Sequence, residues 1–244
     1  MRTAVIADIH ANLEALESVL AGISELGADE IVCLGDIVGY NANPNECVDI
    51  VRDRKIVSIL GNHDICASGL DEPCSFNPTA ERAVLWTRDV LTKENRSFLM
   101  HLPRELAIRD FYLFHGSIHD TNRYIMSKGD ARENFRRLER LPGVCRIGFF
   151  GHTHVRMVLC NEQGSLSCSY PEEVLLQGVH QCLINPGSVG QPRDGDPRAA
   201  FLIYDSTERK ITFHHVAYDI QKCRDKILQA GLPSQLAERL ERGE

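Results

Sequence analysis

The chain has 244 residues, of which 43% are hydrophobic and 25% are charged, the balance of an ordinary globular protein. A chain of this length buries a sizeable core without disulfides or a structural metal. The net charge of -7 argues against a broad nucleic-acid-binding surface, which would need a basic face. It does not argue against a small phosphorylated substrate, because bound metal ions supply positive charge locally.

The nine cysteines show no CxxC spacing, and several lie inside apolar runs, such as Cys33 in IVCLG and Cys182 in QCLIN. We therefore expect reduced thiols that pack as small hydrophobic groups in a cytoplasmic protein. The sequence opens with MRTAVIADIH, which has no signal-peptide pattern. Apolar runs of about six residues are too short to cross a membrane, so no membrane partner is expected.

Residues 1–64 alternate between predicted strands and helices. A strand over residues 3–7 is followed by apolar residues at helical spacing, and this helix ends at Gly27, a favourable C′ residue. A strand over 31–36, a helix near 45–52 and a strand over 55–64 come next. The alternation is typical of a parallel βαβ sheet.

Residues 71–110 differ from this pattern. Helices are predicted over 78–91 and 93–102, as a helical excursion near the mouth of a site or as a plain connecting hairpin, and the sequence leaves both open. Strands then return, and their close spacing predicts a meander in a second, more antiparallel sheet. The tail over 220–244 is predicted to be helical with a break at 231–233, and we expect residues 1–244 to form a single domain.

Five of the predicted strands end in short polar motifs. In chain order these are Asp8-Ile9-His10, Gly35-Asp36, Gly61-Asn62-His63-Asp64, His115-Gly116 and Gly151-His152-Thr153-His154. Ligand sites of open α/β sheets lie outside the carboxyl ends of the strands, so we expect the five loops to converge. The glycines before Asp36, Asn62 and His152 would permit tight turns that aim these side chains at one point.

The residue types in these loops indicate a metal site. Two aspartates, an asparagine and four histidines without a thiolate suit Mn, Fe, Zn, Ni or Co better than Ca or Mg. Seven ligands exceed the needs of one ion that must also bind substrate. Two ions roughly 3.5–4 Å apart that share a carboxylate fit better, an arrangement common in phosphate-ester hydrolysis. One motif alone would mean little, because a lone histidine such as His115 is more often a hydrogen-bonded core residue.

The order D-x-H, G-D, G-N-H-D, H and G-H-x-H, here spanning residues 8–154, resembles that of the calcineurin-like metallophosphoesterases. The segment NPGSVGQPRDGDPRAAFLIYD, residues 185–205, is similar to their small bacterial and archaeal phosphodiesterase branch. With this resemblance, the expected fold is an α/β sandwich of two sheets flanked by helices, in four layers.

The resemblance also implies a role for each motif residue. One metal ion would be held by Asp8, His10 and His154, the other by Asn62, His115 and His152, with Asp36 bridging the two ions. Beside these ligands, His63 is similar to the family's general acid. Asp64 would orient its imidazole and favour the protonated form. Two divalent ions are implied, and Mn²⁺ is the expected activating metal.

The implied mechanism is attack on phosphorus by a hydroxide that both cations generate from a bridging water. His63 would protonate the leaving oxygen, a role typically worth about 10²–10⁴-fold in rate. The roles of two arginines are left open by the sequence. Arg123 is either a phosphate clamp or a surface residue, and Arg193 lies either near the metals or in a structural turn.

The leading functional hypothesis is hydrolysis of phosphodiesters or phosphoanhydrides of small molecules. The sequence also resembles bacterial dinucleoside polyphosphate hydrolases, so a substrate like diadenosine tetraphosphate is included, ahead of cyclic nucleotides or a protein phosphatase role. The alternative is a non-catalytic metal-binding scaffold, like the retromer subunit of this fold, which lacks the catalytic histidine. A nuclease of the DNA-repair branch would need additional elements, and an oligomer of identical chains is compatible with the sequence.

Overall fold

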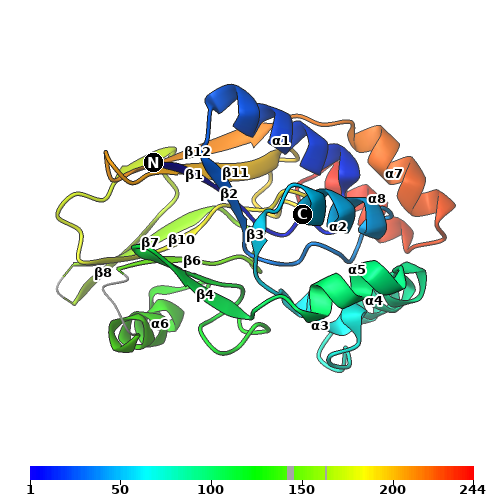
Figure 1. The fold of residues 1–244 in the computed structure, drawn as a ribbon, viewed down its shortest axis with the longest axis horizontal. Helices are drawn as coiled ribbons and strands as arrows, with labels where there is room; N and C mark the ends of the chain where they lie inside the picture. Colours follow the sequence, from blue (N-terminus) through cyan, green and yellow to red (C-terminus); the bar gives the residue numbers. More distant parts are fainter. Residues whose placement is uncertain (142–145, 163) are drawn as a thin grey trace.

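The computed structural model describes residues 1–141, 146–162 and 164–244, and in this part of the chain twelve strands form two six-stranded sheets (Figure 1). The first sheet has the order β3 (Val57–Ser58), β2 (Glu30–Cys33), β1 (Arg2–Ile6), β11 (Ala199–Asp205), β12 (Lys210–Val216), β9 (Glu173–Leu175). The second has the order β4 (Glu105–Ile108), β5 (Phe111–Phe114), β6 (Ile147–Phe149), β10 (Gln181–Asn185), β7 (Met157–Glu162), β8 (Ser165–Ser169).

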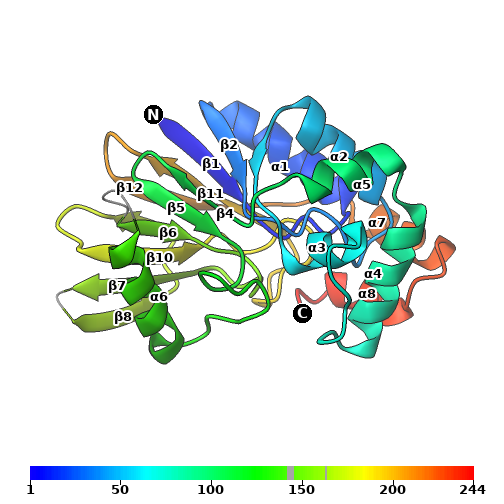
Figure 2. The same cartoon turned by 60° about the horizontal axis from the view of Figure 1, so that its bottom comes forward.

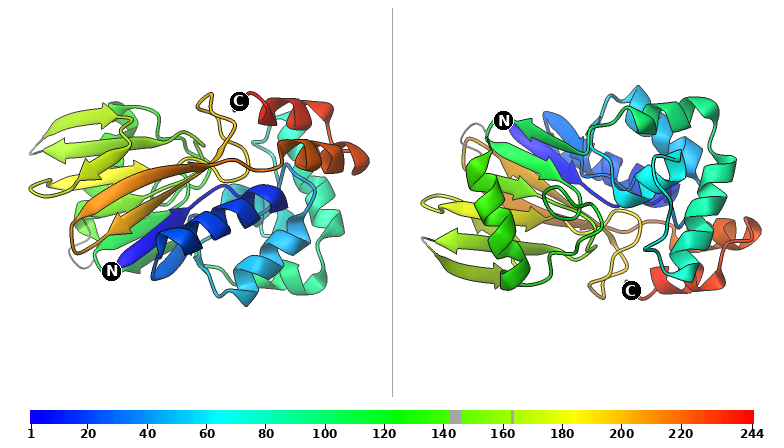
Figure 3. Two further views of the ribbon diagram at one scale, coloured as in Figure 1. Left: turned by 90° about the horizontal axis from the view of Figure 1, so that it is seen from above. Right: turned by 90° about the horizontal axis from the view of Figure 1, so that it is seen from below.

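The sheets stack face to face, and helices cover both outer faces. Apolar side chains of both sheets meet between them, among them Val5, Val32, Phe149 and Ile184. The helices α1 (Leu13–Leu26) and α2 (Pro44–Asp53) pack on the outer face of the first sheet, and α6 (Lys128–Arg140) packs on the second. Seen from above and from below, α1 and α6 lie on opposite sides of the sandwich (Figure 3). The predicted α/β fold of two sheets and four layers is therefore confirmed.

Five further helices gather at one end of the sandwich (Figure 2). They are α3 (Asn62–Ser68), α4 (Pro78–Val90), α5 (Lys93–Met100), α7 (Ile220–Gln229) and α8 (Ser234–Leu240). The parallel strands β1 and β2 run toward this end, so the loops that follow them open onto these helices. No helix in the described part of the chain is long and apolar enough to cross a membrane.

The boundaries of α1 follow from its sequence. The Asn12 side chain accepts a hydrogen bond from the main-chain N–H of Ala15 and caps the first turn. Gly27 adopts a left-handed φ of 70°, and its N–H bonds to the carbonyl of Ile23. Between these ends, the buried face that includes Leu16 and Val19 packs into the core with Phe201 of β11. The predicted stop at Gly27 is thus correct.

The prediction of a meander is wrong. β11 and β12 do not continue the second sheet but cross to the first, where β11 pairs antiparallel with β1. β10 lies between β6 and β7 instead of beside its nearest neighbour in the chain. Close spacing does indicate pairing within the hairpins β7–β8 and β11–β12, but these two hairpins lie in different sheets.

The expectation that every cysteine is reduced is also wrong for one pair. Cys160 of β7 and Cys182 of β10 are opposite each other in antiparallel register and are joined as a disulfide. Six further cysteines are free, of which four are buried, as expected for small hydrophobic side chains. Cys145 lies outside the described residues.

Candidate metal centre

The fold brings the seven predicted ligands together at the helical end of the sandwich. Asp8 and His10 follow β1, and Asp36 follows β2. The remaining four lie at the start of α3 or just after β5 and β6, namely Asn62, His115, His152 and His154. All seven are at most 6% exposed. Five loops that are distant in the sequence therefore meet at one buried point.

The ligand atoms fall into two groups that share one carboxylate. The first ligand cluster consists of Asp8, His10, Asp36 and His154, whose ligand atoms all lie within 4.8 Å of one another. The second ligand cluster meets the same 4.8 Å limit and contains Asp36, His115 and His152. Asn62 lies beside the second, with its Oδ1 atom 3.1 Å from Nε2 of His115.

Main-chain carbonyls fix how the imidazole rings face the clusters. The Nδ1 atom of His10 donates to the carbonyl of Val38 at 3.1 Å, and Nδ1 of His154 donates to that of Gln191 at 2.6 Å. Because a carbonyl only accepts, both Nδ1 atoms carry the proton, and the Nε2 lone pairs point inward. Burial lowers the pKa of both rings well below the ordinary value, which keeps them in the neutral, metal-binding form.

The other two histidines use opposite nitrogens. His115 donates from Nδ1 to the carbonyl of Leu34 at 2.8 Å, so its Nε2 atom faces the second cluster. In His152 the Nε2 atom donates to the carbonyl of Asn122 at 3.1 Å, which leaves Nδ1 as the ligand nitrogen. This outer shell of carbonyls is how proteins commonly orient metal-binding histidines.

Without a bound cation, the negative charge of the shared Asp36 carboxylate is buried and only partly compensated by protein atoms. Oδ2 of Asp36 is buried without a hydrogen bond, 3.5 Å from Nε2 of His10 and 3.2 Å from Nε2 of His115. The Nε2 atoms of His10 and His154 lie 3.0 Å apart, with lone pairs facing each other. A buried carboxylate and opposed lone pairs are unfavourable without a positive charge between them. The donor set therefore fits divalent cations.

The backbone at the ligands is strained in a way that the sequence does not reveal. Five of them have left-handed φ angles: Asp8 (55°), His10 (48°), Asp36 (53°), His152 (67°) and His154 (59°). For residues with a Cβ atom this region costs roughly 1–2 kcal/mol each, and such strain concentrates at functional sites. Hydrogen bonds from the ligand backbone offset it, for example from the N–H of His152 to the carboxylate of Asp8.

The glycines before the ligands serve two purposes. Gly35 has the left-handed φ of 89° expected of a tight turn. Gly61 does not, since its φ is −93°. A Cβ atom at Gly61 would lie 2.1 Å from Oδ1 of Asp36, so this position needs glycine for close approach. The predicted turn is thus correct at Gly35 and wrong at Gly61.

His63 lies beside the ligands but outside both clusters. Its ring centroid is 4.8 Å from that of His10, 4.4 Å from Tyr40 and 4.6 Å from Phe76. Nδ1 is buried without a hydrogen bond. A Cβ atom on Gly39 would come within 2.4 Å of it, so Nδ1 faces this glycine. Burial lowers the pKa of His63 to about 4.

Asp64 does not orient His63. Its Oδ1 atom accepts from the N–H of Val38 at 3.1 Å, and its Oδ2 atom accepts from the N–H of Gly61 at 3.0 Å. The carboxylate therefore ties the loop after β2 to the first turn of α3. The prediction that Asp64 acts on the imidazole is wrong, because adjacent side chains at the start of a helix point in different directions.

A cavity of about 130 Å³, the metal-centre cavity, opens over the ligands. Besides ligands and His63, it is lined by Tyr40, Ser75, Phe76, Asn77, Ala80, Asn122, Tyr124 and Arg193. Sequence reasoning missed the aromatic members, which no motif marks. Arg193 is the arginine that lines this cavity, whereas Arg123 pairs with Glu133 at 3.3 Å on the surface. The surface interpretation of Arg123 is therefore correct.

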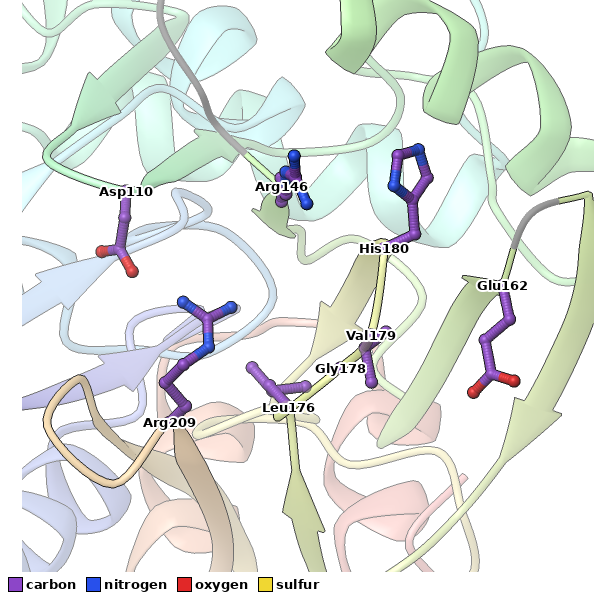
Figure 4. Close-up of a pocket in the computed structure, with 8 residues that line it drawn as sticks. All are labelled: Asp110, Arg146, Glu162, Leu176, Gly178, Val179, His180 and Arg209. Atoms are coloured by element: carbon purple, nitrogen blue, oxygen red, sulfur yellow. The ribbon is translucent and has the colours of Figure 1, made fainter.

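A larger cavity of about 750 Å³ lies at the other end of the sandwich and contains none of the predicted ligands (Figure 4). Asp110 and Arg146 lie just before β5 and β6, and Arg209 lies between β11 and β12. These are the amino ends of parallel strands whose carboxyl ends lead to His115 and His152. Cavity size alone therefore does not identify the metal centre.

Comparison with known proteins identifies the family to which the chain belongs. The calcineurin-like phosphoesterase superfamily domain matches residues 1–209. An uncharacterised protein of Methanocaldococcus jannaschii is 40% identical over 244 residues, covering 97% of this chain and 96% of the relative.

Two solved structures share the fold over the whole chain. The metallophosphoesterase of Sphaerobacter thermophilus is 38% identical with a TM-score of 0.88, and the match covers 100% of this chain and 99% of that one. A hypothetical protein of Pyrococcus horikoshii is similar in fold, with a TM-score of 0.80, 21% identity and coverage of 100% and 98%. The chain belongs to the calcineurin-like phosphoesterase superfamily and is a metallophosphoesterase, a hydrolase of phosphorylated substrates.

Proposed function

We propose that this chain hydrolyses phosphodiester or phosphoanhydride bonds of small molecules with two divalent cations. The observation that carries the proposal is the position of Asp36, whose carboxylate belongs to both ligand clusters. One ion would be held by Asp8, His10 and His154 and the other by Asn62, His115 and His152, with Asp36 between them. When bound, such ions lower the pKa of a coordinated water and offset phosphoryl charge. Mn²⁺ is the activating ion we expect.

We assign to His63 the donation of a proton to the leaving oxygen. Nδ1 faces Gly39, so Nε2 is the nitrogen left to reach an oxygen in the metal-centre cavity. Its pKa of about 4 means that the free ring is neutral at pH 7. An anionic phosphoryl group brought beside the ring favours the protonated form. Protonation of His63 would then coincide with substrate binding, and Nε2 would donate to the departing oxygen.

The substrate class follows from the size and lining of the cavity. About 130 Å³ accommodates a phosphoryl group and part of its substituent, with Phe76 and Tyr124 offering aromatic contact surface. A dinucleoside polyphosphate is the first natural candidate. A solved structure described as a putative diadenosine tetraphosphatase shares the fold, with a TM-score of 0.53 and 16% identity. We further propose that the chain is one cytoplasmic domain.

The test is a substrate panel with the Mn²⁺-loaded full chain. It compares bis-p-nitrophenyl phosphate, p-nitrophenyl phosphate, cyclic AMP and diadenosine tetraphosphate. We expect Mn²⁺-stimulated turnover of the diester and of the dinucleoside polyphosphate, and its loss in Asp36→Ala. Absence of metal-stimulated turnover on every member would contradict the proposal and favour a non-catalytic metal-binding scaffold.

A further inference from the structure

A second cavity of about 310 Å³, the α8 cavity, adjoins the metal-centre cavity. Both are lined by Tyr40 and Asn77, so these two residues form the boundary between them. The outer wall comes from α8 and the residues after it, including Arg239 and Arg242. A group bound at the metals can therefore extend past Tyr40 and Asn77 toward α8.

Arg193 stands on the metal side of this boundary. Its guanidinium carbon is 5.7 Å from the centroid of the Tyr40 ring. Nη2 donates to Oε1 of Gln191 at 2.9 Å and to the Tyr40 hydroxyl at 3.4 Å, while Nε is buried without a partner. Within residues 1–141, 146–162 and 164–244, Arg193 forms no ion pair with a carboxylate. Its charge is thus held in place but not neutralised by a neighbouring side chain.

Arg239 stands on the α8 side. Its Nε donates to the terminal main-chain oxygen of Glu244, and no side-chain carboxylate pairs with it in the described part of the chain. Burial lowers the pKa of Arg239, and the charge of Arg193 acts in the same direction while that of Glu244 opposes it. By contrast, Arg242 pairs with the Glu244 side chain at 3.4 Å.

The other groups in the α8 cavity are of both signs. Glu238 and Glu244 contribute carboxylates. The amino end of α4, with Asn77 as its N-cap and Thr79 in its first turn, contributes the positive end of a helix dipole. Arg193 and Arg239 are partly buried cations on the two sides of the Tyr40–Asn77 boundary, and neither pairs with a side-chain carboxylate in the described residues. An anion that reached both guanidinium groups would offset the cost of burying them. Guanidinium groups bind phosphate oxygens through paired N–H donors.

We propose that Arg193 and Arg239 form a subsite for a second phosphoryl group of the substrate. The inference rests on the proposed function and narrows it to compounds with two adjacent phosphoryl groups, such as a phosphoanhydride chain. Arg193 would contact the group nearest the metals, and Arg239 the next. Because α8 lies beyond residues 1–209, this selectivity would come from outside the segment that defines the superfamily.

The test compares two ligands that are not hydrolysed and differ by one phosphonyl group. Calorimetry on the Mn²⁺-loaded full chain measures the Kd of methylphosphonate and of methylenediphosphonate, with free Mn²⁺ held constant. We expect the diphosphonate to bind about tenfold more tightly, the value of a hydrogen bond to a charged group. Arg239→Met should bring the ratio of the two Kd values close to one.

The matched control is Arg198→Met, which removes the same charge from an arginine that pairs with Asp196 on the surface. It should keep the wild-type ratio. Arg239→Gln is a second variant, which keeps a hydrogen-bond donor for Glu244. With two variants, the test remains valid even if Arg239→Met does not fold. A wild-type ratio in either Arg239 variant, or no preference in the wild type, would overturn the subsite. Absence of Mn²⁺-stimulated turnover by the wild type on every member of the substrate panel would instead contradict the proposed function.

Discussion

At the scale of single residues, the proposed mechanism assigns metal binding and proton transfer to different side chains. Asp36 belongs to both ligand clusters, and its Oδ1 atom also accepts from the main-chain N–H of His63 at 2.8 Å. His63 is next to a ligand in the sequence but contributes no atom to either cluster. The two functions should therefore separate under substitution.

His63→Ala should leave the metal content nearly unchanged and reduce turnover by about 10²–10⁴-fold, because only the proton donor is lost. Asp36→Ala should lose both metal and turnover. The measurements are metal analysis of the purified variants and kcat on a substrate with a poor leaving group. Full activity of His63→Ala on that substrate would show that the proton comes from elsewhere.

Gly61→Ala should lose bound metal although glycine contributes no ligand. The added Cβ atom would lie 2.1 Å from Oδ1 of Asp36, so the shared carboxylate must move. We expect bound metal to fall by more than half, measured by metal analysis after dialysis. Gly129→Ala is the control, since the nearest atom to its Cβ would be 3.4 Å away. If both variants retain the metal, Asp36 does not depend on this close approach.

The convergence of the seven predicted ligands could be foreseen from the sequence, because each motif follows an apolar run and strand ends are where loops converge. The left-handed φ angles of these residues could not be predicted from the sequence. Such angles are usually marked by glycine, whereas here they occur at aspartate, histidine and Ala11. The contacts of Asp64 were missed for another reason. They depend on Val38, which only the folded chain brings close.

At the scale of elements, the C-terminal helices are attached to the sandwich by a buried carboxylate. Glu14 of α1 is 5% exposed and accepts hydrogen bonds from Lys226 and Lys222 of α7. Burial alone would raise the pKa of Glu14, but the hydrogen bonds that its carboxylate accepts, from Lys226 first and also from Lys222 and its own main-chain N–H, together outweigh burial and lower the pKa. The sequence predicted the helical tail over 220–244, yet not where it docks, because a Glu and a Lys 212 residues apart are unrelated in one sequence.

Glu14→Gln should destabilise the protein by about 1.5–3 kcal/mol at pH 7, the value of a hydrogen bond to a charged group. A lowered folded-state pKa means that the stabilisation is complete above the unfolded value near 4.5 and is lost as pH falls through the folded value. The difference between variant and wild type should therefore shrink below pH 4.5. Urea unfolding at several pH values measures it, with Glu17→Gln, exposed on the same helix, as the control. A difference that does not vary with pH would exclude this ion pair as its source.

At the scale of the whole molecule, five loops from both sheets meet at the candidate metal centre. Bound ions would therefore add to the hydrogen bonds that already join these loops, such as the one from the N–H of His152 to the carboxylate of Asp8. Removing the ions would leave the buried Oδ2 atom of Asp36 without a partner.

Metal removal by a chelator should therefore lower the Tm of the whole protein. At a metal concentration of 100 times the Kd, bound metal adds about 2.7 kcal/mol, which corresponds to roughly 5–10 °C for a chain of this size. Differential scanning calorimetry of the holo and chelated forms measures the shift. The same experiment on Asp36→Ala should show almost none, and an equal shift there would place the stabilising metal elsewhere.

The pairing of β1 with β11 has a consequence for how the protein is made. β1 leaves the ribosome well before β11, because its antiparallel partner is nearly 200 residues behind it. The hydrogen bond that orients the imidazole of His154 likewise cannot form until Gln191, 37 residues later, has been made. Pairing across such sequence separation is slow to form. A nascent chain that already carries Asp8, His10, Asp36 and Asn62 therefore has four of the seven predicted ligands but no metal site, and competence to capture ions arrives only after β11 has been made.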